Sequence, residues 1–423
     1  MAPIYCAVLF SAVTLACAQA LPVWGATEEV DPLSLESAPE AATPAATGVK
    51  IFLEGSGGNV AQRYETQSRD IGRASLDFSY STRLAPGLRA VLSDRIDHLY
   101  PAETGVDSTV NSLREAYLSW QPEGSNTAIE LGRINLRYGP GYGYNPTDFF
   151  RDGSLRTLTS TNPFAMRENR LGTVMLRAQQ LWSGGSLSVA YSPKLEDRPS
   201  ADGMSLDFGA TNNRNRALIE LSTQFSQRIS SQVMLYKEQD SDPAIGASLS
   251  ALVSDGAVAH AEWSRSSEPT QLNRALGISG PTAQQDRFAG GLTYTTLGKL
   301  SLTAEYQYNG FGTTQRDWES LASKPLTKFA LLTDAQQRQE LVPRQAYLFY
   351  VTQKSFVYKD FDLTAFVRVN AEDQSHLSWL ELRHHWPKFD LALQWQQYSG
   401  SAGSEYGIVP ETRVIQILAN YYF

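Results

Sequence analysis

From Gly48 onward, the chain repeats one pattern: segments of about nine to twelve residues in which apolar and polar side chains alternate, separated by turn residues. Alternation with period two places the two sets of side chains on opposite faces of a β-strand. Charged residues fall on one parity and aliphatic residues on the other. The clearest examples are the segments 217–225, 300–308, 362–370 and 391–398.

The length of these segments points to a membrane rather than to a soluble β-sandwich. Strands of soluble proteins are usually about five or six residues long, whereas crossing a bilayer at a tilt takes about nine to eleven. No segment after residue 20 approaches the roughly 18 apolar residues of a transmembrane helix. We therefore predict an all-β protein, a single antiparallel transmembrane β-barrel of about 18 strands (16–18) over residues 48–423.

The segment 412–423 alternates in the same way, with Ile415, Ile417, Ala419, Tyr421 and Phe423 on one parity. An unpaired apolar strand is an exposed edge, so we expect this strand to pair with the one that begins near Gly48 and to close the cylinder. Tyr421 and Phe423 resemble the C-terminal assembly signal of bacterial outer-membrane proteins. This resemblance implies recognition by the barrel assembly machinery and a place in outer-membrane lipid and lipopolysaccharide.

Residues 1–20 have the features of a secretory signal peptide, with an apolar stretch from Ala7 to Ala16 and an Ala18-Gln19-Ala20 cleavage site. Met1 to Tyr5 lacks Lys and Arg, so the true start could lie upstream, and Leu15-Ala16-Cys17 leaves a lipoprotein site as an alternative. Both cysteines of the chain lie in this segment, which would leave a mature chain without thiols. Residues 21–47, acidic and rich in proline, are predicted to be a disordered tether.

The connections between the predicted strands are of two kinds. Some are tight turns, such as 183–185 and 297–299, and others are long polar loops. Short turns at the periplasmic side and long loops at the outer side are typical of outer-membrane barrels. One long loop, 311–343, contains two candidate short helices, 318–321 and 334–341, and could be an outer cap or an infolded plug. The long loops lie near 138–168, 194–213, 267–286 and 311–343.

The most distinctive stretch spans residues 130–168. Its apolar parity switches from Leu131 to Ile134 and Leu136, which predicts a β-bulge at Gly132-Arg133 that aims Arg133 into the lumen. A loop rich in Gly, Tyr and Arg follows and could fold inward as a constriction. Rings of arginine select anions in such pores. The alternative is that these arginines lie at the rim and pair with acidic groups or lipopolysaccharide phosphates. The candidate constriction residues are Arg133, Arg137, Asp148, Arg151, Arg156, Arg167 and Arg170.

Within this stretch, Leu131-Gly132-Arg133, Tyr138-Gly139 and Asn145-Pro146-Thr147-Asp148 resemble motifs of large outer-membrane barrels of the alginate-export type and of related porin-like families. The resemblance covers about forty residues and the general barrel pattern. It implies a passive channel, either for export of an acidic polysaccharide, with periplasmic transport partners, or for uptake of small or hydrophobic solutes.

Several charged residues on the polar parity are expected to face the lumen, where ion pairs would support a hydrated wall. They are Glu115, Arg177, Glu220, Glu262, Glu305, Arg368, Glu381 and Arg383.

Signals for catalysis are weak. The segment Asp94-Arg95-Ile96-Asp97-His98 is similar to the acidic and histidine groups of outer-membrane proteases, and a complete site of that kind would need a second acidic partner across the barrel. Adjacent strand residues such as His384 and His385 point to opposite faces, so no metal site is predicted. We expect no cofactor. The net charge of −8 argues against nucleic acid as a partner.

The function predicted from the sequence is therefore a porin-like channel of the bacterial outer membrane for passive diffusion of small solutes, anionic ones included. A dedicated exporter of a secreted polysaccharide is the alternative, and an outer-membrane hydrolase is the remote one. Aromatic residues, at 11 %, are abundant enough for girdles at both membrane interfaces.

Overall fold

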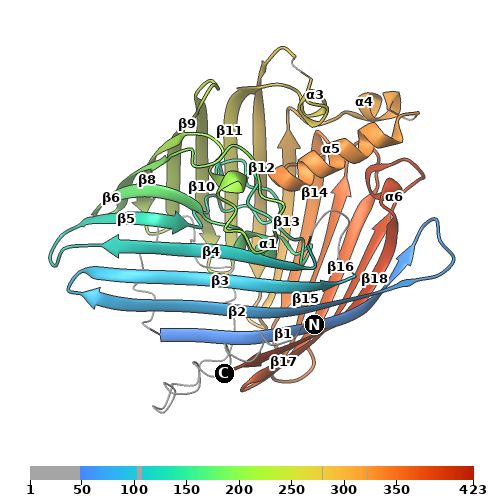
Figure 1. The fold of residues 1–423 in the computed structure, drawn as a ribbon, viewed down its shortest axis with the longest axis horizontal. Helices are drawn as coiled ribbons and strands as arrows, with labels where there is room; N and C mark the ends of the chain where they lie inside the picture. Colours follow the sequence, from blue (N-terminus) through green and yellow to red (C-terminus); the bar gives the residue numbers. More distant parts are fainter. Residues whose placement is uncertain (1–47, 102–106, 279, 322) are drawn as a thin grey trace, which may run out of the picture.

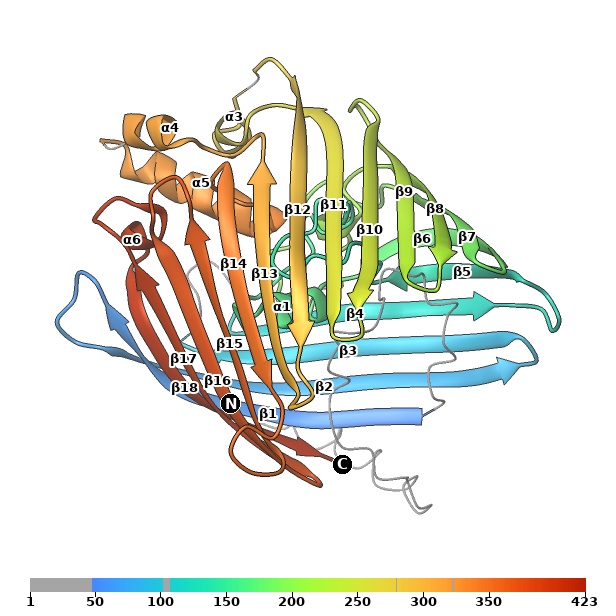
Figure 2. The same ribbon diagram turned by 180° about the vertical axis from the view of Figure 1, so that it is seen from behind.

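The computed structural model describes residues 48–101, 107–278, 280–321 and 323–423. The predicted signal peptide and tether therefore lie outside the described residues. The described chain forms one antiparallel sheet of 18 strands that closes on itself, which confirms the predicted barrel (Figures 1 and 2). The strands are β1 (Gly48–Gln62), β2 (Arg69–Ala85), β3 (Leu88–Tyr100), β4 (Thr109–Trp120), β5 (Thr127–Ile134), β6 (Thr173–Trp182), β7 (Gly185–Ser192), β8 (Arg216–Ser226), β9 (Ile229–Glu238), β10 (Ala244–Ser254), β11 (Ala257–Glu268), β12 (Ala283–Thr295), β13 (Leu300–Asn309), β14 (Gln345–Gln353), β15 (Phe361–Asn370), β16 (His376–Trp386), β17 (Phe389–Ser399) and β18 (Glu411–Tyr422).

Closure takes place between β1 and β18, as the alternation in 412–423 predicted. Phe52 lies opposite Tyr422 and Val60 lies opposite Val414 in a regular antiparallel register. Every other strand pairs with its two neighbours in sequence, so the strands form one closed ring. The backbone N–H and C=O groups are thereby satisfied within the sheet, which is what a membrane requires.

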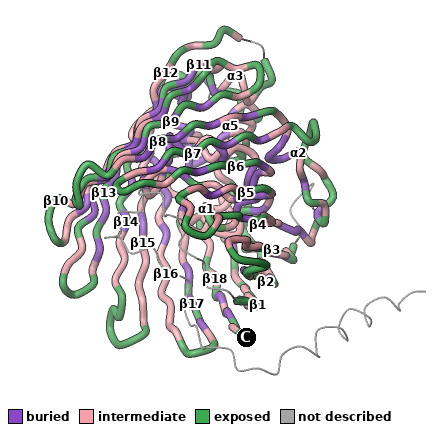
Figure 3. The backbone as a smooth tube through the Cα atoms, turned by 90° about the vertical axis from the view of Figure 1, so that its left-hand side faces the viewer, coloured by how far each residue is buried: buried purple, intermediate pink, exposed green. Residues whose placement is uncertain are grey.

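The alternation of exposed and buried residues follows the sequence pattern (Figure 3). In β8, Ile219 and Leu221 are 46 % and 45 % exposed on the outer face, whereas Glu220 between them is fully buried on the inner face. In β13, Leu302 faces outward and Glu305 faces inward. The outer face is thus a continuous apolar belt, and the inner face carries the polar and charged side chains.

Exposed aromatic side chains mark the ends of this belt. At the end with the short turns they belong to alternate strands, and others lie at the end with the long loops, in agreement with the predicted girdles. Those at the short-turn end are Trp120, Trp182, Phe225, Tyr294, Trp386 and Tyr421. Those at the long-loop end include Tyr100, Tyr191 and Tyr347.

Short helices lie in the long connections. Helices α3, α4, α5 and α6 gather at the long-loop mouth of the barrel, and α1 lies within its outline (Figures 1 and 2). The helices are α1 (Pro163–Glu168), α2 (Phe208–Thr211), α3 (Gln271–Ala275), α4 (Gln315–Ser320), α5 (Pro325–Arg338) and α6 (Glu405–Ile408). Among the described residues, none of these helices has the length and apolar character needed to cross a membrane.

The predicted bulge at Gly132-Arg133 is wrong. Pairing of β5 with β4 and β6 is regular, and Gly132 turns the chain through a φ of +135° without an extra residue. Arg133 therefore keeps the parity of Leu131, which is 59 % exposed on the outer face. A register shift near this stretch lies between β3 and β4, where Arg114 is the extra residue. Its guanidinium pairs with Asp77 on the inner wall, at 2.5 Å and 2.8 Å.

Candidate functional site: an infolded loop and a charged cavity

The connection between β5 and β6, residues 135–172, folds into the barrel and reaches the opposite wall. Two buried carboxylates of that wall hold its backbone. Glu262 on β11 accepts the N–H of Gly141 at 2.5 Å. Glu305 on β13 accepts the N–H groups of Tyr142 and Gly143, at 2.7 Å and 3.0 Å. The predicted infolding of this loop is therefore present in the structure.

Glu262 holds more of the loop than one amide. Its carboxylate also accepts the side-chain amide of Asn145 at 2.9 Å and the hydroxyl of Thr147 at 2.8 Å. Only about 1 % of Glu262 is exposed, so an ionised carboxylate there depends on these donors. Glu305 has side-chain partners of its own, His260 at 3.0 Å and Gln307 at 2.6 Å.

Glycine is required at two points where the loop meets this wall. A Cβ on Gly139, whose φ is +88°, would lie 2.1 Å from the Glu262 carboxylate. A Cβ on Gly143 would lie 2.4 Å from the amide nitrogen of Gln307 and 2.8 Å from Leu348. The glycines of the 139–143 stretch thus let the backbone approach the two acidic anchors.

Apolar packing fixes both sides of the loop. On one side, Tyr138 and Phe150 join a buried cluster with Met175, Leu218 and Met234 on the inner face of β6 to β9. On the other side, the rings of Tyr142 and Phe164 pack edge to face with their centroids 5.1 Å apart. Both rings pack against an aromatic row of the wall. This row comprises Tyr350, Phe366 and Trp379 on β14, β15 and β16.

Hydrogen bonds extend the attachment to other strands. Arg73 on β2 donates to the carbonyl of Thr159 at 2.8 Å, and Thr161 donates to Gln396 on β17 at 2.7 Å. Arg368 on β15 donates to the carbonyl of Gly143 at 2.7 Å. The loop is therefore attached around most of the barrel circumference, and we describe it as a constriction loop of residues 135–172.

Asp148 and Arg170, both predicted site residues, form a buried ion pair at 2.6 Å within the constriction loop. Burial lowers the pKa of Arg170 to about 10, against the opposing effect of Asp148. Arg151 pairs with Glu340, which follows α5. Burial would raise the pKa of Glu340, but Arg151 and Arg287 together hold it below its usual value.

Arg156 and Arg133 connect backbone segments instead of lining a pore. Arg156 donates to the carbonyls of Asn111 and Ser205 at 2.7 Å each and pairs with Asp207 at 3.3 Å. Arg133 donates to the carbonyl of Leu206 at 2.7 Å. Because β5 ends at Ile134 while β4 continues to Thr109, this part of the wall lacks a strand. The segment 202–212 covers the gap, and the two arginines hold it there.

Arg167 is bound in the same way, through the carbonyls of Tyr138 and Gly139. Arg137 differs from the other predicted arginines. It is exposed, and its guanidinium has no hydrogen bond or ion pair within the described part of the chain. It interacts electrostatically with Glu115 and Glu168. The structure therefore brings six of the seven predicted residues into loop attachment and leaves Arg137 accessible.

Ion pairs dominate the inner wall, as expected for the lumen-facing charges. Arg177 pairs with Glu130 at 3.0 Å, and Arg383 pairs with Glu381 at 2.8 Å. A larger network crosses β1 to β4, in which arginines alternate with carboxylates. Its members are Glu54, Arg73, Asp77, Arg95, Asp97 and Arg114.

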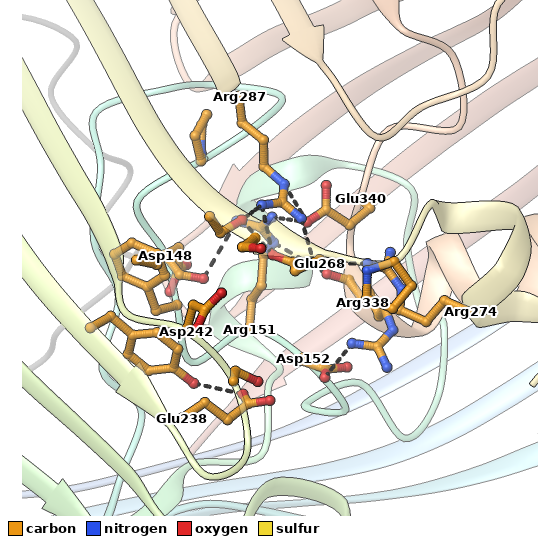
Figure 4. Close-up of a pocket in the computed structure, with 18 of the residues that line it drawn as sticks. Asp148, Arg151, Asp152, Glu238, Asp242, Glu268, Arg274, Arg287, Arg338 and Glu340 are labelled. Atoms are coloured by element: carbon orange, nitrogen blue, oxygen red, sulfur yellow. Dashed lines mark hydrogen bonds and ion pairs between the residues drawn. The ribbon is translucent and has the colours of Figure 1, made fainter. Parts of the chain in front are cut away.

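A cavity of about 340 Å³ lies between the constriction loop, the upper ends of β9 to β12, and α5 (Figure 4). Five arginines and six carboxylates line it. Of these, only Asp148 and Arg151 were predicted as site residues, and Arg287 and Glu340 are among those that were not. Glu340 pairs with Arg151 across 189 positions of sequence, so no local sequence pattern indicates this contact. Glu262 and Glu305 were predicted to face the lumen. Their inward-facing parity, together with the glycine-rich loop elsewhere in the chain, was the sequence signal available for their anchoring role.

The residues that suggested catalysis do not come together. Asp97 is buried on the inner face and pairs with Arg95, whereas His98 is exposed on the other face and contacts Thr109. His385 pairs with Asp390, and His384 contacts the carbonyl of Asp360. Across the described ranges, no three His, Cys, Asp or Glu side chains are grouped so as to hold a metal ion.

No protein-family model and no curated protein matches the chain. Solved structures do match. Acinetobacter baumannii OccAB1 superposes with a TM-score of 0.59 at 12 % identity, covering 89 % of this chain and 96 % of that one. Pseudomonas aeruginosa OpdL gives 0.55 at 12 % identity, with 90 % and 99 % covered. Pseudomonas aeruginosa OccK11 (OpdR) gives 0.54 at 10 % identity, with 89 % and 95 % covered. These neighbours are outer-membrane porins. At such low identity the likeness establishes the fold, that of a porin-type barrel.

Proposed function

We propose that this protein is an outer-membrane channel through which small solutes diffuse passively, past the constriction loop 135–172. The observation that carries the proposal is the attachment of this loop to the far wall through Glu262 and Glu305 inside a closed barrel. A loop held by buried hydrogen bonds gives a fixed constriction, and a fixed constriction sets a size limit for diffusing solutes.

The apolar belt and the aromatic residues at both of its ends support the membrane location. Lipid-facing positions such as Leu131, Leu221 and Leu393 are between 45 % and 59 % exposed. Exposure of this much aliphatic surface would favour aggregation in water and is stable in hydrocarbon. These features are consistent with an outer-membrane barrel whose short turns face the periplasm.

Arg137 supports a modest preference for anions. It is the accessible cation among the predicted constriction residues, whereas the other arginines are engaged by carbonyls or carboxylates. A single unpaired guanidinium attracts anions weakly, and salt screens the attraction over about 10 Å at 0.1 M ionic strength. A conduit for an acidic polysaccharide would need a continuous series of unpaired cations, so we favour small solutes.

Planar-bilayer recording on purified protein tests the proposal. We expect discrete current steps in 1 M KCl, and a reversal potential in a KCl gradient that indicates weak anion selectivity. Protein that inserts, as shown by protease protection of the barrel, and yet gives no current would contradict diffusion through the lumen. Liposome swelling with sugars of increasing size then measures the size limit.

A further inference from the structure

The cavity of about 340 Å³ at the long-loop mouth is large enough for a small organic solute. It lies directly above the constriction loop, which supplies Asp148, Phe149 and Arg151 to its lining. The upper ends of β9 to β12, the β9–β10 turn, α3 and α5 supply most of the remaining walls (Figure 4). A solute entering from this mouth would meet the cavity before the constriction.

The arginines of the cavity are largely neutralised by carboxylates of the same cavity. Arg287 pairs with Glu268 at 2.9 Å and with Glu340 at 3.2 Å. Arg338 pairs with Asp152 at 2.8 Å, and Arg214 pairs with Glu238. Paired guanidinium groups have little capacity left for a solute carboxylate. The binding capacity of the cavity therefore depends on the polar atoms that remain without partners.

Those atoms are of both signs and come from opposite walls. On one wall, Oδ1 of Asp148 is buried without a hydrogen-bond partner, although Oδ2 pairs with Arg170 at 2.6 Å, and Asp242 is exposed without any ion pair to the described residues. On the other wall, Nη2 of Arg274 is buried without a partner, although Nη1 pairs with Glu268 at 2.8 Å. Figure 4 shows Asp148 and Asp242 on the left of the cavity and Arg274 on the right.

The cavity also has an apolar surface. The rings of Phe149 and Tyr236 stack with centroids 4.7 Å apart and an interplanar angle of 6°. Both residues line the cavity. A stacked aromatic pair contacts hydrocarbon favourably and offers no charge.

We propose that this cavity binds small zwitterions, with a cationic group at Asp148 and Asp242, a carboxylate at Arg274, and a hydrocarbon spacer on Phe149 and Tyr236. This inference rests on the proposed function, since it names the solute class that the channel would take up. An acidic group at one end and a basic group at the other disfavour solutes that carry a single charge, because one wall is then left unpaired. The cavity would concentrate the zwitterion at the entrance to the constriction.

Isothermal titration calorimetry on detergent-solubilised protein tests the site without requiring an open pore. The probes are the ω-amino acids from glycine to 6-aminohexanoate, with butyrate and butylamine as the single-charge halves of 4-aminobutyrate. We expect one spacer length to bind best, at least about 10-fold more tightly than either half. Equal or tighter binding of butyrate would overturn the proposal in favour of a plain anion site, and absence of binding by every ω-amino acid would overturn it outright.

Two substitutions separate the ends of the site. D242N should weaken the binding of the best ω-amino acid and of butylamine about 5-fold or more and leave the binding of butyrate unchanged. R274Q should weaken the ω-amino acid and butyrate and leave butylamine unchanged. The control is D240N. Asp240 lies on the same β9–β10 turn but outside the cavity lining, so this substitution removes the same charge without touching the site. An effect of D240N equal to that of D242N would show that only overall charge matters and would contradict the site.

Current through single channels distinguishes this inference from the proposed function. If the channel conducts and the ω-amino acids neither bind nor block it, the zwitterion site is wrong and the channel stands. If the ω-amino acids bind in detergent but no current is ever seen, the site stands and diffusion through the lumen is wrong.

Discussion

The backbone N–H of Gly141 lies 2.5 Å from the carboxylate of Glu262, although 121 residues separate them in sequence. The contact joins a loop that leaves the wall after β5 to the inner face of β11. Loss of one hydrogen bond to a charged group costs about 1.5–3 kcal/mol, and Glu262 accepts from Gly141, Asn145 and Thr147. The position of the constriction therefore depends strongly on this residue.

E262Q should loosen the constriction loop, because an amide nitrogen would replace one of the accepting oxygens and would face the donor groups of the loop. We expect larger and noisier single-channel currents than in the wild type. The matched control is E220Q. Glu220 is buried on the same inner face, but neither of its oxygens has a hydrogen-bond partner in the loop or the wall. Wild-type currents for E262Q would contradict the anchoring role.

Gly139 should not tolerate a side chain. In G139A, the added Cβ would meet the Glu262 carboxylate at 2.1 Å, and the φ of +88° is unfavourable for alanine. We expect the same increase in current noise as for E262Q, together with faster proteolysis of the loop 135–172. G124A is the control, since Gly124 has a similar φ of +73° but open space around its Cβ position. Equal effects of G139A and G124A would attribute the result to backbone strain alone.

Arg156 should stabilise the segment 202–212 that covers the gap beside β4. Its guanidinium contacts the carbonyls of Asn111, Gly203 and Ser205 and the carboxylate of Asp207. In R156Q these acceptors lose a buried partner, so hydrogen exchange of 202–208 should become at least about 10-fold faster, which corresponds to about 1.4 kcal/mol. R198Q should leave the exchange rates unchanged, because Arg198 lies in the same loop but is exposed and its guanidinium makes no hydrogen bond or ion pair to the described residues.

Glu405 should make the loop between β17 and β18 sensitive to pH. Burial, with a contribution from Asp373, raises the pKa of Glu405 to about 8. The folded loop therefore retains a proton between about pH 4.5 and pH 8 that the unfolded chain releases, so its stability falls as the pH rises through this window. Limited proteolysis of residues 400–410 should be slow at pH 5 and faster at pH 8.5.

E405Q removes this titration and should give proteolysis rates that do not change between the two pH values. Other charged groups near Glu405 are Arg368 and Asp373. Lys328 contacts the neighbouring carbonyl of Gly403. D373N should reduce the pH dependence without abolishing it, because Asp373 is the smaller of the two causes. A pH dependence in E405Q equal to the wild type would place the titrating group elsewhere.

Arg137 should contribute to anion preference, since it is the exposed arginine of the constriction region. R137Q is expected to shift the reversal potential in a KCl gradient toward cation selectivity, with a larger shift at low salt because screening is then weaker. R167Q serves as a comparison, because the Arg167 guanidinium is held by the carbonyls of Tyr138 and Gly139. An unchanged reversal potential for R137Q at low salt would remove Arg137 from the selectivity of the channel.

The fold could be predicted because the geometry of a barrel imposes a local pattern, the alternation of apolar and polar residues along each strand. Alternation in segments such as 217–225 and 300–308 fixes which residues face lipid, and closure follows from the need to pair every strand edge. The strand count, the pairing of β1 with β18 and the asymmetry of the loops all agree with that pattern.

The site could be predicted only in part. The arginine-rich stretch and the inward folding of its loop were evident, but the partners of the arginines were not. Glu340 pairs with Arg151 from 189 residues away, and Asp207 pairs with Arg156 from a different loop. Such pairs depend on how long loops meet above the barrel, which no local period encodes. A bulge was predicted at Gly132-Arg133 because Ile134 and Leu136 are apolar on the parity opposite Leu131. They are apolar there because they pack against the buried cluster that includes Tyr138 and Phe150 of the infolded loop, and the pairing of the strand stays regular.

The anchors of the constriction loop have one more consequence. Glu262 and Glu305 hold Gly141, Tyr142 and Gly143 by main-chain amides, so these contacts use no side chain of the three residues. Substitutions elsewhere in the loop could therefore alter what passes while the loop keeps its position. The groups that position the constriction loop are thus different from the loop side chains that a passing solute would meet.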